Sequence, residues 1–216
     1  MQSGQIESLY DAVADRYADE FWRELDRKPF DRHWLERLAA LAKGIGPICD
    51  MGCGPGQVAA YLRRRGAEVI GVDLSEAMLG QARRLNPGIE FRREDMLDLR
   101  LPSGSLGGIA AFYAIVNFDL AQVETAFGGF SRVLAPGGSA LVAFHIGDEV
   151  RQVNEFLGTP IAARFAFFQP DDVCERLVAA GLKVEEVTIR YPYEGIEYPS
   201  KRAYILARKP DRPDGA

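Results

Sequence analysis

Three aspartates follow three successive apolar segments of the chain, at places where a carboxylate can bind a ligand. Asp50 lies inside the segment ICDMGCGPG, Asp73 ends the segment VIGVD, and Asp95 follows the segment IEFRRE. If these segments are parallel strands, their carboxyl ends meet at one edge of a sheet, which is where ligands bind. There Asp73 can accept hydrogen bonds from ribose hydroxyls, Asp95 can accept one from the amine of an adenine, and Asp50 suits an ammonium group. The series indicates a site for a positively charged nucleoside.

Simpler roles stay open for two of these acids. Asp73 can serve only to help cap the helix that begins at Ser75, and Asp95, taken alone, is a loop residue. We favour ligand binding because three acids at successive strand ends are hard to attribute to chance.

A glycine-rich turn, Gly52-Cys53-Gly54-Pro55-Gly56, connects the first segment to a helix. Glycines let the backbone approach a ligand, and the following helix presents free N–H groups. A dinucleotide-binding turn has the pattern G-x-G-x-x-G, which would put its third glycine at position 57. That position is Gln57, and a carboxylate at Asp50 is unfavourable beside a pyrophosphate. A nicotinamide-dependent dehydrogenase is therefore the weaker interpretation.

The chain has two histidines, and one of them is placed for acid–base chemistry. His145 ends a predicted strand at the rim that faces the ligand, where its reference pKa of about 6.5 suits proton transfer at neutral pH. A hydrogen-bonded structural histidine is the alternative. His33 lies in a predicted helix beside Trp34 and is expected at the surface or in the core. Tyr113 is a second candidate for contact with substrate or cofactor.

Alternating helices and strands are predicted to position these residues. Helical spacing, capping residues and glycine stops predict helices over residues 6–25, 29–44 with Asp31 as the cap, from the glycine turn to 65, 75–85, 120–134 and 171–180. Continuous apolar runs predict strands over residues 48–51, 68–72, 89–92, 109–116 and 139–145. Alternation of this kind indicates a parallel sheet that is covered by helices on both faces.

The last two predicted strands, residues 183–190 and 202–208, are separated by a loop that is too short for a crossover helix. They must therefore pair as an antiparallel hairpin. The fold class is α/β: a doubly wound, mostly parallel, Rossmann-like sheet of seven strands with an antiparallel C-terminal edge and an N-terminal helical lid. We expect one domain over residues 1–216. It begins with a helical lid (1–44) and a cofactor-binding core (45–145), which are followed by a substrate-side insertion (146–169) and by a final helix with its hairpin (170–209).

Composition narrows the class of partner. The chain has 26 Lys and Arg against 31 Asp and Glu, a formal net charge of −5, and 47% hydrophobic residues. This balance is typical of a globular protein and argues against a nucleic-acid partner. Three cysteines (Cys49, Cys53 and Cys174) have no metal-ligand spacing and suit a reducing compartment. The longest apolar run, residues 109–116, is too short to span a bilayer, and the N-terminus has no secretory pattern. We expect a soluble cytoplasmic protein without metal or membrane partner, of open oligomeric state.

At this point the sequence resembles the class I S-adenosylmethionine-dependent methyltransferases. The resemblance is carried by four stretches and is strongest over residues 45–145: ICDMGCGPG, VIGVDLSEAML, FRREDMLDL and AFGGFSRVLAPGG. An acidic residue that often opens the fourth strand in this family is replaced here by Gly107-Gly108. That end of the strand lies away from the ligand, so the resemblance implies the same fold and the same cofactor, S-adenosylmethionine.

The resemblance also implies roles for particular residues. Gly52, Cys53 and Gly54 would approach the methionine part of the cofactor, and Asp50 would support its ammonium group. Asp73 would hold the ribose, while the adenine would be bound by Leu74, Asp95 and Met96. The end of the fourth strand, at Phe112, Tyr113 and Ala114, would lie under the methionine part. The N-terminal helix is a candidate lid that carries Tyr17 over the cofactor with Tyr10 and Phe21, although ordinary packing of an amphipathic helix predicts the same spacing, above all for Trp22.

The expected reaction is methyl transfer to an oxygen or nitrogen atom of a small molecule. Substrate choice is assigned to the phenylalanine-rich insertion 147–169 and to the hairpin loop 191–198, although most of the phenylalanines are expected to be core residues. A protein that binds the cofactor without turning it over is the non-enzymatic alternative. A nucleic-acid methyltransferase is disfavoured because AIVNF, residues 114–118, stands where such enzymes carry an Asn/Asp-Pro-Pro-aromatic motif.

Overall fold

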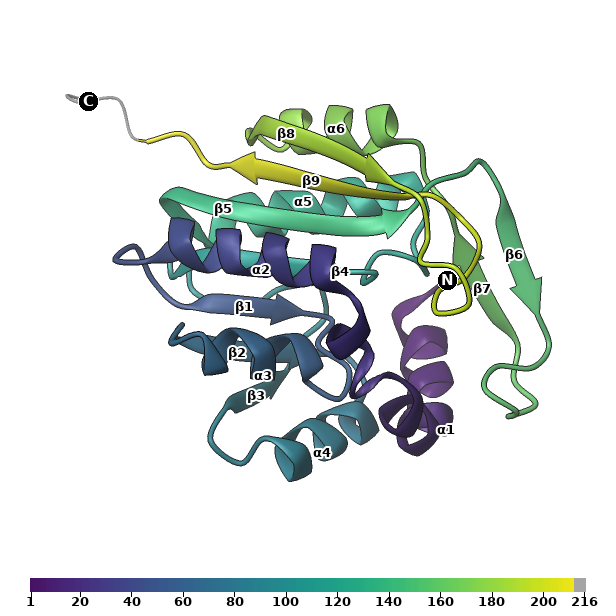
Figure 1. Ribbon diagram of the computed structural model, residues 1–216. Coiled ribbons are helices and arrows are strands. Elements are labelled where there is room, and N and C mark those ends of the chain that lie inside the picture. Colours follow the sequence, from purple (N-terminus) through teal and green to yellow (C-terminus); the bar gives the residue numbers. More distant parts are fainter. Residues whose placement is uncertain (212–216) are drawn as a thin grey trace.

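The computed structural model describes residues 1–211 and has a seven-stranded sheet at its centre (Figure 1). The strand order is β3-β2-β1-β4-β5-β9-β8. The strands are β1 (Ile48–Met51), β2 (Val69–Asp73), β3 (Glu90–Arg93), β4 (Leu106–Phe112), β5 (Leu134–His145), β8 (Lys183–Arg190) and β9 (Arg202–Arg208). The first five are parallel, whereas β9 pairs antiparallel with both β5 and β8. The predicted fold class, including the antiparallel C-terminal edge, is confirmed.

Two helical layers cover the sheet, because successive strand residues point to opposite faces. Ile48 of β1 belongs to the apolar cluster that includes residues of α2 (Pro29–Ala42) and α3 (Gln57–Arg64), whereas its neighbour Cys49 belongs to the cluster that includes residues of α5 (Leu120–Val133) and α6 (Pro170–Ala179). Figure 1 shows α2 and α3 in front of the sheet and α5 and α6 behind it. All four residues of β1 are buried, as expected for a central parallel strand.

Helix α1 (Ser3–Phe21) lies at the carboxyl end of the parallel strands and rests on α4 (Glu76–Leu85). Asp11 Oδ1 accepts hydrogen bonds from Ser75 Oγ (2.6 Å) and from the backbone N–H of Ala77 (3.1 Å). Both donors belong to the N-terminus of α4, where an anion is stabilised by the helix dipole. Helix α1 is thus joined to the edge of the sheet at which the ligand is predicted.

Three local predictions differ from the structure. Strand β4 ends at Phe112 rather than at residue 116, because the backbone of Tyr113 turns to the left-handed region with φ of 54°. Asp31 caps no helix: it is buried in the first turn of α2, which Pro29 opens. The chain before α2 forms a short 3₁₀ helix, η1 (Glu24–Arg27), because the expected first helix stops at Phe21.

The insertion that follows β5 contains a second, two-stranded sheet that was not predicted. Strand β6 (Val150–Val153) pairs antiparallel with β7 (Ala163–Ala166). Its loop meets α1, where Arg16 Nη1 donates to the carbonyl oxygen of Leu157 (2.9 Å). Figure 1 shows this hairpin standing outside the main sheet. No helix in the described residues 1–211 is long and apolar enough to cross a lipid bilayer.

Candidate active site

Asp73, at the carboxyl end of β2, anchors the glycine turn. Its Oδ2 accepts the backbone N–H of Gly54 (2.8 Å), and its Oδ1 accepts the backbone N–H of Ser75 (2.9 Å). Burial raises the pKa of this carboxyl, and the backbone N–H groups that it accepts act in the opposite direction. The capping interaction considered from the sequence is therefore present. It leaves room for ligand binding because each carboxylate oxygen can accept a second hydrogen bond.

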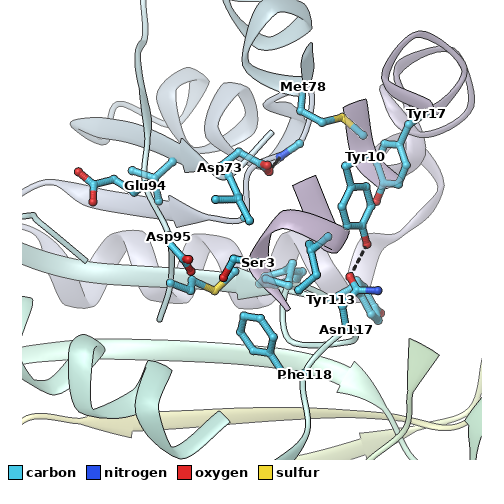
Figure 2. Close-up of a pocket in the computed structure, with 18 residues that line it drawn as sticks. Ser3, Tyr10, Tyr17, Asp73, Met78, Glu94, Asp95, Tyr113, Asn117 and Phe118 are labelled. Carbon is cyan, nitrogen blue, oxygen red and sulfur yellow. Dashed lines mark hydrogen bonds between the residues drawn. The ribbon is translucent and has the colours of Figure 1, made fainter. Parts of the chain in front are cut away.

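A narrow cavity of about 70 Å³ lies over Asp73 (Figure 2). The core contributes Leu74, Asp95 and Met96, three of the predicted cofactor-binding residues, to its lining. Helix α1 contributes the opposite wall with Ser3, Ile6, Tyr10 and Tyr17. The Tyr10 hydroxyl donates to Asn117 Oδ1 (2.8 Å), which is the dashed line in Figure 2. Helix α1 thus closes this end of the site.

The glycine turn needs its glycines for two reasons. Gly52 and Gly54 have φ angles of 70° and 51°, which residues with a side chain rarely adopt. A Cβ atom on Gly52 would also lie 2.9 Å from the Cβ of Ala114, which follows β4. The turn therefore keeps its backbone open to the two cavities that it lines.

Hydrogen-bond acceptors gather beside the turn, and one of them, Glu24, already has a cation, because Lys28 Nζ lies 2.5 Å from its Oε2. Asp50 is buried, and its Oδ2 accepts the N–H of Ala59 (2.9 Å). Burial raises the pKa of Asp50 to about 7, with smaller contributions from Asp73 and Glu24. Gln57 donates its amide N–H to Glu24 Oε1 (2.9 Å), and its own Oε1 is buried without a hydrogen-bond partner among the described residues. The sequence analysis gave neither Glu24 nor Gln57 a role in binding.

A second cavity, of about 420 Å³, continues from the turn along the ends of β4 and β5. At the turn it is lined by Asp50, Gln57 and Glu24, and farther on by Tyr113 and His145. Its other walls come from late in the chain, from the β6–β7 hairpin and the β8–β9 loop, and include Phe156, Phe165, Phe167, Ile196, Glu197 and Tyr198. The expectation that most of the insertion's phenylalanines are core residues is wrong. Only Phe168 is fully buried, because the hairpin carries the other three on the cavity wall.

His145 sits among aromatic rings inside this second cavity. Its ring centroid lies 5.0 Å from that of Tyr113, 5.3 Å from that of Phe167 and 5.9 Å from that of Tyr198. Its Nδ1 is 2.8 Å from Ser200 Oγ. Burial, followed by the nearby charges of Arg202 and other cations, lowers the pKa of His145 to about 3. The imidazole is therefore neutral at physiological pH.

A buried charged cluster supports the wall behind His145. Arg190 donates to both carboxylate oxygens of Glu197 (2.6 and 2.8 Å), to Asp31 Oδ1 (2.9 Å) and to the hydroxyl of Tyr204. Tyr204 in turn donates to Asp31 Oδ1 (2.6 Å). Burial raises the pKa of Asp31, whereas hydrogen bonds from Arg190 and Tyr193 hold the pKa of Glu197 at about 2. No sequence signal marks this cluster, because α2 and β8 each carry several other charged residues and Glu197 lies in a loop.

Every residue predicted for the site lies on one of the two cavities. Those on the narrow cavity or on both are Tyr17, Gly52, Gly54, Asp73, Leu74, Asp95, Met96, Phe112 and Tyr113. Asp50, Cys53 and His145 lie on the larger one. Phe21 also lines the larger cavity, whereas Trp22 lines neither. Their placement is observed, and their individual roles stay predictions.

Comparison with known proteins identifies the family. A family described as a methyltransferase domain matches residues 48–138. A demethylmenaquinone methyltransferase of Thermus thermophilus is 31% identical over 206 residues, which cover 82% of this chain and 92% of that relative. The chain belongs to the class I S-adenosylmethionine-dependent methyltransferases. The methyltransferase thus has the cofactor that the resemblance implied.

Other relatives agree at the level of the family. A ubiquinone/menaquinone biosynthesis C-methyltransferase of Syntrophotalea carbinolica is 38% identical over 147 residues, covering 62% of this methyltransferase and 58% of that relative. A methyltransferase structure from Methanosarcina mazei has the same fold, with a TM-score of 0.70 at 15% identity, covering 77% of this chain and 93% of that one. The chain spans 57–62% of the length of several other curated relatives.

The described residues suit S-adenosylmethionine. The partnerless Oε1 of Gln57 and the carboxylate of Asp50 are acceptors that an ammonium group could use. Asp73 has carboxylate oxygens at the narrow cavity for ribose hydroxyls, and Leu74 and Met96 offer apolar surface there for a base. The chemistry of these side chains therefore fits the ammonium group, the ribose and the base of the cofactor.

Proposed function

We propose that this methyltransferase methylates a small hydroxylated aromatic molecule bound in the larger cavity, and that His145 accepts the hydroxyl proton. The observation that carries the proposal is the position of His145, on the wall of a cavity of about 420 Å³ that begins at the cofactor turn. An acceptor molecule bound in this cavity would lie between His145 and the cofactor.

The walls of the larger cavity favour an aromatic acceptor. Phe156, Phe165 and Phe167 line the cavity on one side, with Tyr113 and Tyr198 near His145. Aromatic side chains favour flat apolar rings through offset and edge-to-face contacts. The relatives support the same class, because one of them is a demethylmenaquinone methyltransferase and another is a ubiquinone/menaquinone biosynthesis C-methyltransferase.

S-adenosylmethionine supplies a methyl group on a positively charged sulfur, which becomes neutral when the methyl group leaves. Asp50 and Gln57 would hold the ammonium group, Asp73 would hold the ribose, and Leu74, Asp95 and Met96 would hold the adenine. Helix α1 acts as the lid, with Tyr10 and Tyr17 covering the cofactor. Fixing donor and acceptor in this way can supply roughly 7–11 kcal/mol of the barrier reduction.

Charges around His145 prepare the acceptor for attack. The imidazole is neutral and can accept a proton through Nε2, the ring nitrogen that makes no hydrogen bond to the described chain. Lys28 and Arg202, which pair with Glu24 and Glu197, line the same cavity, and beside their positive charges the build-up of negative charge on the acceptor oxygen is opposed less than it would be beside a neutral wall. The proposed role of Tyr113 is to hold the acceptor ring against His145.

The acceptor atom follows from this chemistry. Sequence analysis favours oxygen or nitrogen, and a hydroxyl oxygen is the better partner for a proton-accepting histidine. Deprotonation of an aromatic hydroxyl also makes the adjacent ring carbons nucleophilic, which is compatible with the C-methyltransferase relative. We therefore propose methylation at the hydroxyl oxygen or at a ring carbon that it activates.

Purified protein incubated with S-adenosylmethionine and matched panels of phenols, hydroquinones, amines and carboxylates tests the proposal. We expect S-adenosylhomocysteine to form only with hydroxylated rings, and His145→Gln to lower turnover by at least ~100-fold. His33→Gln, at the exposed second histidine, is the control. Binding of S-adenosylhomocysteine without turnover of any acceptor would instead indicate a cofactor-binding scaffold, and selective turnover of amines would move the acceptor atom to nitrogen.

A further inference from the structure

Ser200 connects His145 to the outside of the molecule. Its hydroxyl oxygen is 2.8 Å from His145 Nδ1, although 55 residues separate the two in sequence. Ser200 belongs to the β8–β9 loop and does not line the cavity that contains His145. It lines a different pocket, open to solvent, together with Asp148 and Glu149.

The wall between the two pockets is thin. Phe167 and Tyr198 line both of them, and the rings of these two residues meet edge to face with centroids 5.8 Å apart. His145 is on the inner side of this wall and Ser200 is on the outer side. Their hydrogen bond therefore crosses from the acceptor cavity to the solvent-facing pocket.

Methyl transfer to a hydroxylated acceptor creates a need for such a connection. The sulfonium loses its charge and the acceptor loses a proton, so each turnover releases one proton. The proton cannot stay on His145, because burial of the ring and the nearby charges of Arg202, Lys28 and Arg190 oppose an imidazolium there more strongly than Glu197 favours it.

We propose that Ser200 holds His145 in the tautomer with the proton on Nδ1 and passes that proton to solvent, which makes Ser200 a positioning and relay residue. This inference rests on the proposed role of His145 as the base. The acceptor O–H bond breaks and its proton joins Nε2, while the Nδ1 proton moves to Ser200 Oγ and the Ser200 hydroxyl proton moves to water in the outer pocket. The imidazole stays neutral throughout. After product leaves, Nε2 loses its proton to water in the emptied cavity, and Nδ1 regains one through Ser200.

The tautomer of the His145 imidazole can be determined without a methyl-accepting substrate. The protein has two histidines, so ¹⁵N imidazole spectra of the protein saturated with S-adenosylhomocysteine contain two ring systems, and His145→Gln assigns them. We expect Nδ1 of His145 to be protonated and Nε2 to be bare in the parent protein. Ser200→Ala should mix the two tautomers, and Ser200→Thr, which keeps the hydroxyl, should restore one. A parent spectrum with the proton on Nε2 would overturn the proposal.

Turnover measurements distinguish the proposed relay through Ser200 from the proposed base, His145. With 1,4-naphthalenediol as the probe acceptor, we expect Ser200→Ala to lower kcat by roughly 10- to 100-fold and to increase the solvent deuterium isotope effect, with unchanged affinity for S-adenosylhomocysteine. Ser200→Thr should recover kcat to within about threefold. Parent-like kcat and isotope effect in Ser200→Ala, alongside a defective His145→Gln, would refute the relay and keep the base. A fully active His145→Gln would refute the proposed base itself.

Discussion

Gln57 donates its amide N–H to Glu24 Oε1 across 2.9 Å, and its own carbonyl oxygen is left without a hydrogen-bond partner among the described residues. A carboxylate only accepts hydrogen bonds, so the orientation of the amide is fixed by its neighbour. The consequence is a buried acceptor, Gln57 Oε1, beside the carboxylate of Asp50 on the wall of the larger cavity. Gln57 stands where a dinucleotide-binding turn would have its third glycine, and in this protein it offers the cavity a hydrogen-bond acceptor.

Gln57→Leu should weaken binding of S-adenosylhomocysteine by roughly 10- to 100-fold, because the ammonium group loses an acceptor and a buried hydrogen bond to a charged group contributes about 1.5–3 kcal/mol. Binding of 5′-methylthioadenosine, which lacks the amino acid portion, should stay the same. Calorimetry with the two ligands checks this. Equal losses for both ligands would mean that Gln57 supports the turn instead of binding the ammonium group.

Cofactor affinity should depend on pH through Asp50. The free protein holds the pKa of this carboxyl at about 7, raised mainly by burial. An ammonium group stabilises the charged form of Asp50, so affinity for S-adenosylhomocysteine should rise as pH increases from 6 to 8. Below the pKa the affinity should rise by up to about tenfold per pH unit, and above the pKa it should level off. His145 does not contribute, because its pKa is about 3. Calorimetry at pH 6, 7 and 8 tests the expectation, and Asp50→Asn should flatten the profile.

Asp73→Ala should weaken binding of S-adenosylhomocysteine by about 1.5–3 kcal/mol, the scale of hydrogen bonds to a charged group. Because Asp73 also accepts the N–H groups of Gly54 and Ser75, thermal unfolding without ligand must be measured beside the titration. Unchanged affinity would remove Asp73 from the ribose site. Lower affinity with an equal loss for 5′-methylthioadenosine is the expected pattern, since both ligands carry the ribose.

Tyr10→Phe should speed release of S-adenosylhomocysteine by about fivefold, because it removes the 2.8 Å hydrogen bond from α1 to Asn117 and a neutral hydrogen bond is worth about 1 kcal/mol. Stopped-flow displacement measures the rate. Ser8→Ala is the control on the same helix, since the Ser8 hydroxyl only returns to the carbonyl oxygen of Gly4. Parent-like release from Tyr10→Phe would argue that α1 does not act as a lid.

Arg190→Met should lower the free energy of unfolding by about 3–5 kcal/mol, because it leaves the buried carboxylate of Asp31 without its ion-pair partner and leaves Glu197 with Arg202 and Lys28 alone. Arg92→Met provides the comparison. Its partner Glu90 is 2.7 Å away but the pair is exposed, so the expected loss is at most about 1 kcal/mol. Similar denaturation midpoints for the two variants would contradict the importance of the buried cluster.

Local patterns were sufficient to predict the residues that the core contributes to the two cavities. Apolar runs, the glycine turn and the acids that follow the strands all lie between residues 48 and 96, so sequence order and spatial order coincide there. The long-range contacts of the site could not be obtained in the same way. Glu24 reaches the turn from a 3₁₀ helix, Arg190 reaches Asp31 across 159 positions, and Ser200 reaches His145 across 55. Pairings of this kind depend on how distant segments pack and leave no periodic signal.

Early and late segments of the chain contribute to different parts of the site, and this has a consequence for how substrate preference can change. Cofactor contacts come from the early strands, whereas the acceptor cavity is enclosed by the β6–β7 hairpin and by a β8–β9 loop that Arg190 fastens to α2. Grafting these two late segments between homologues should therefore transfer substrate preference as a unit, provided that Arg190 and its acidic partners Asp31 and Glu197 are transferred as well.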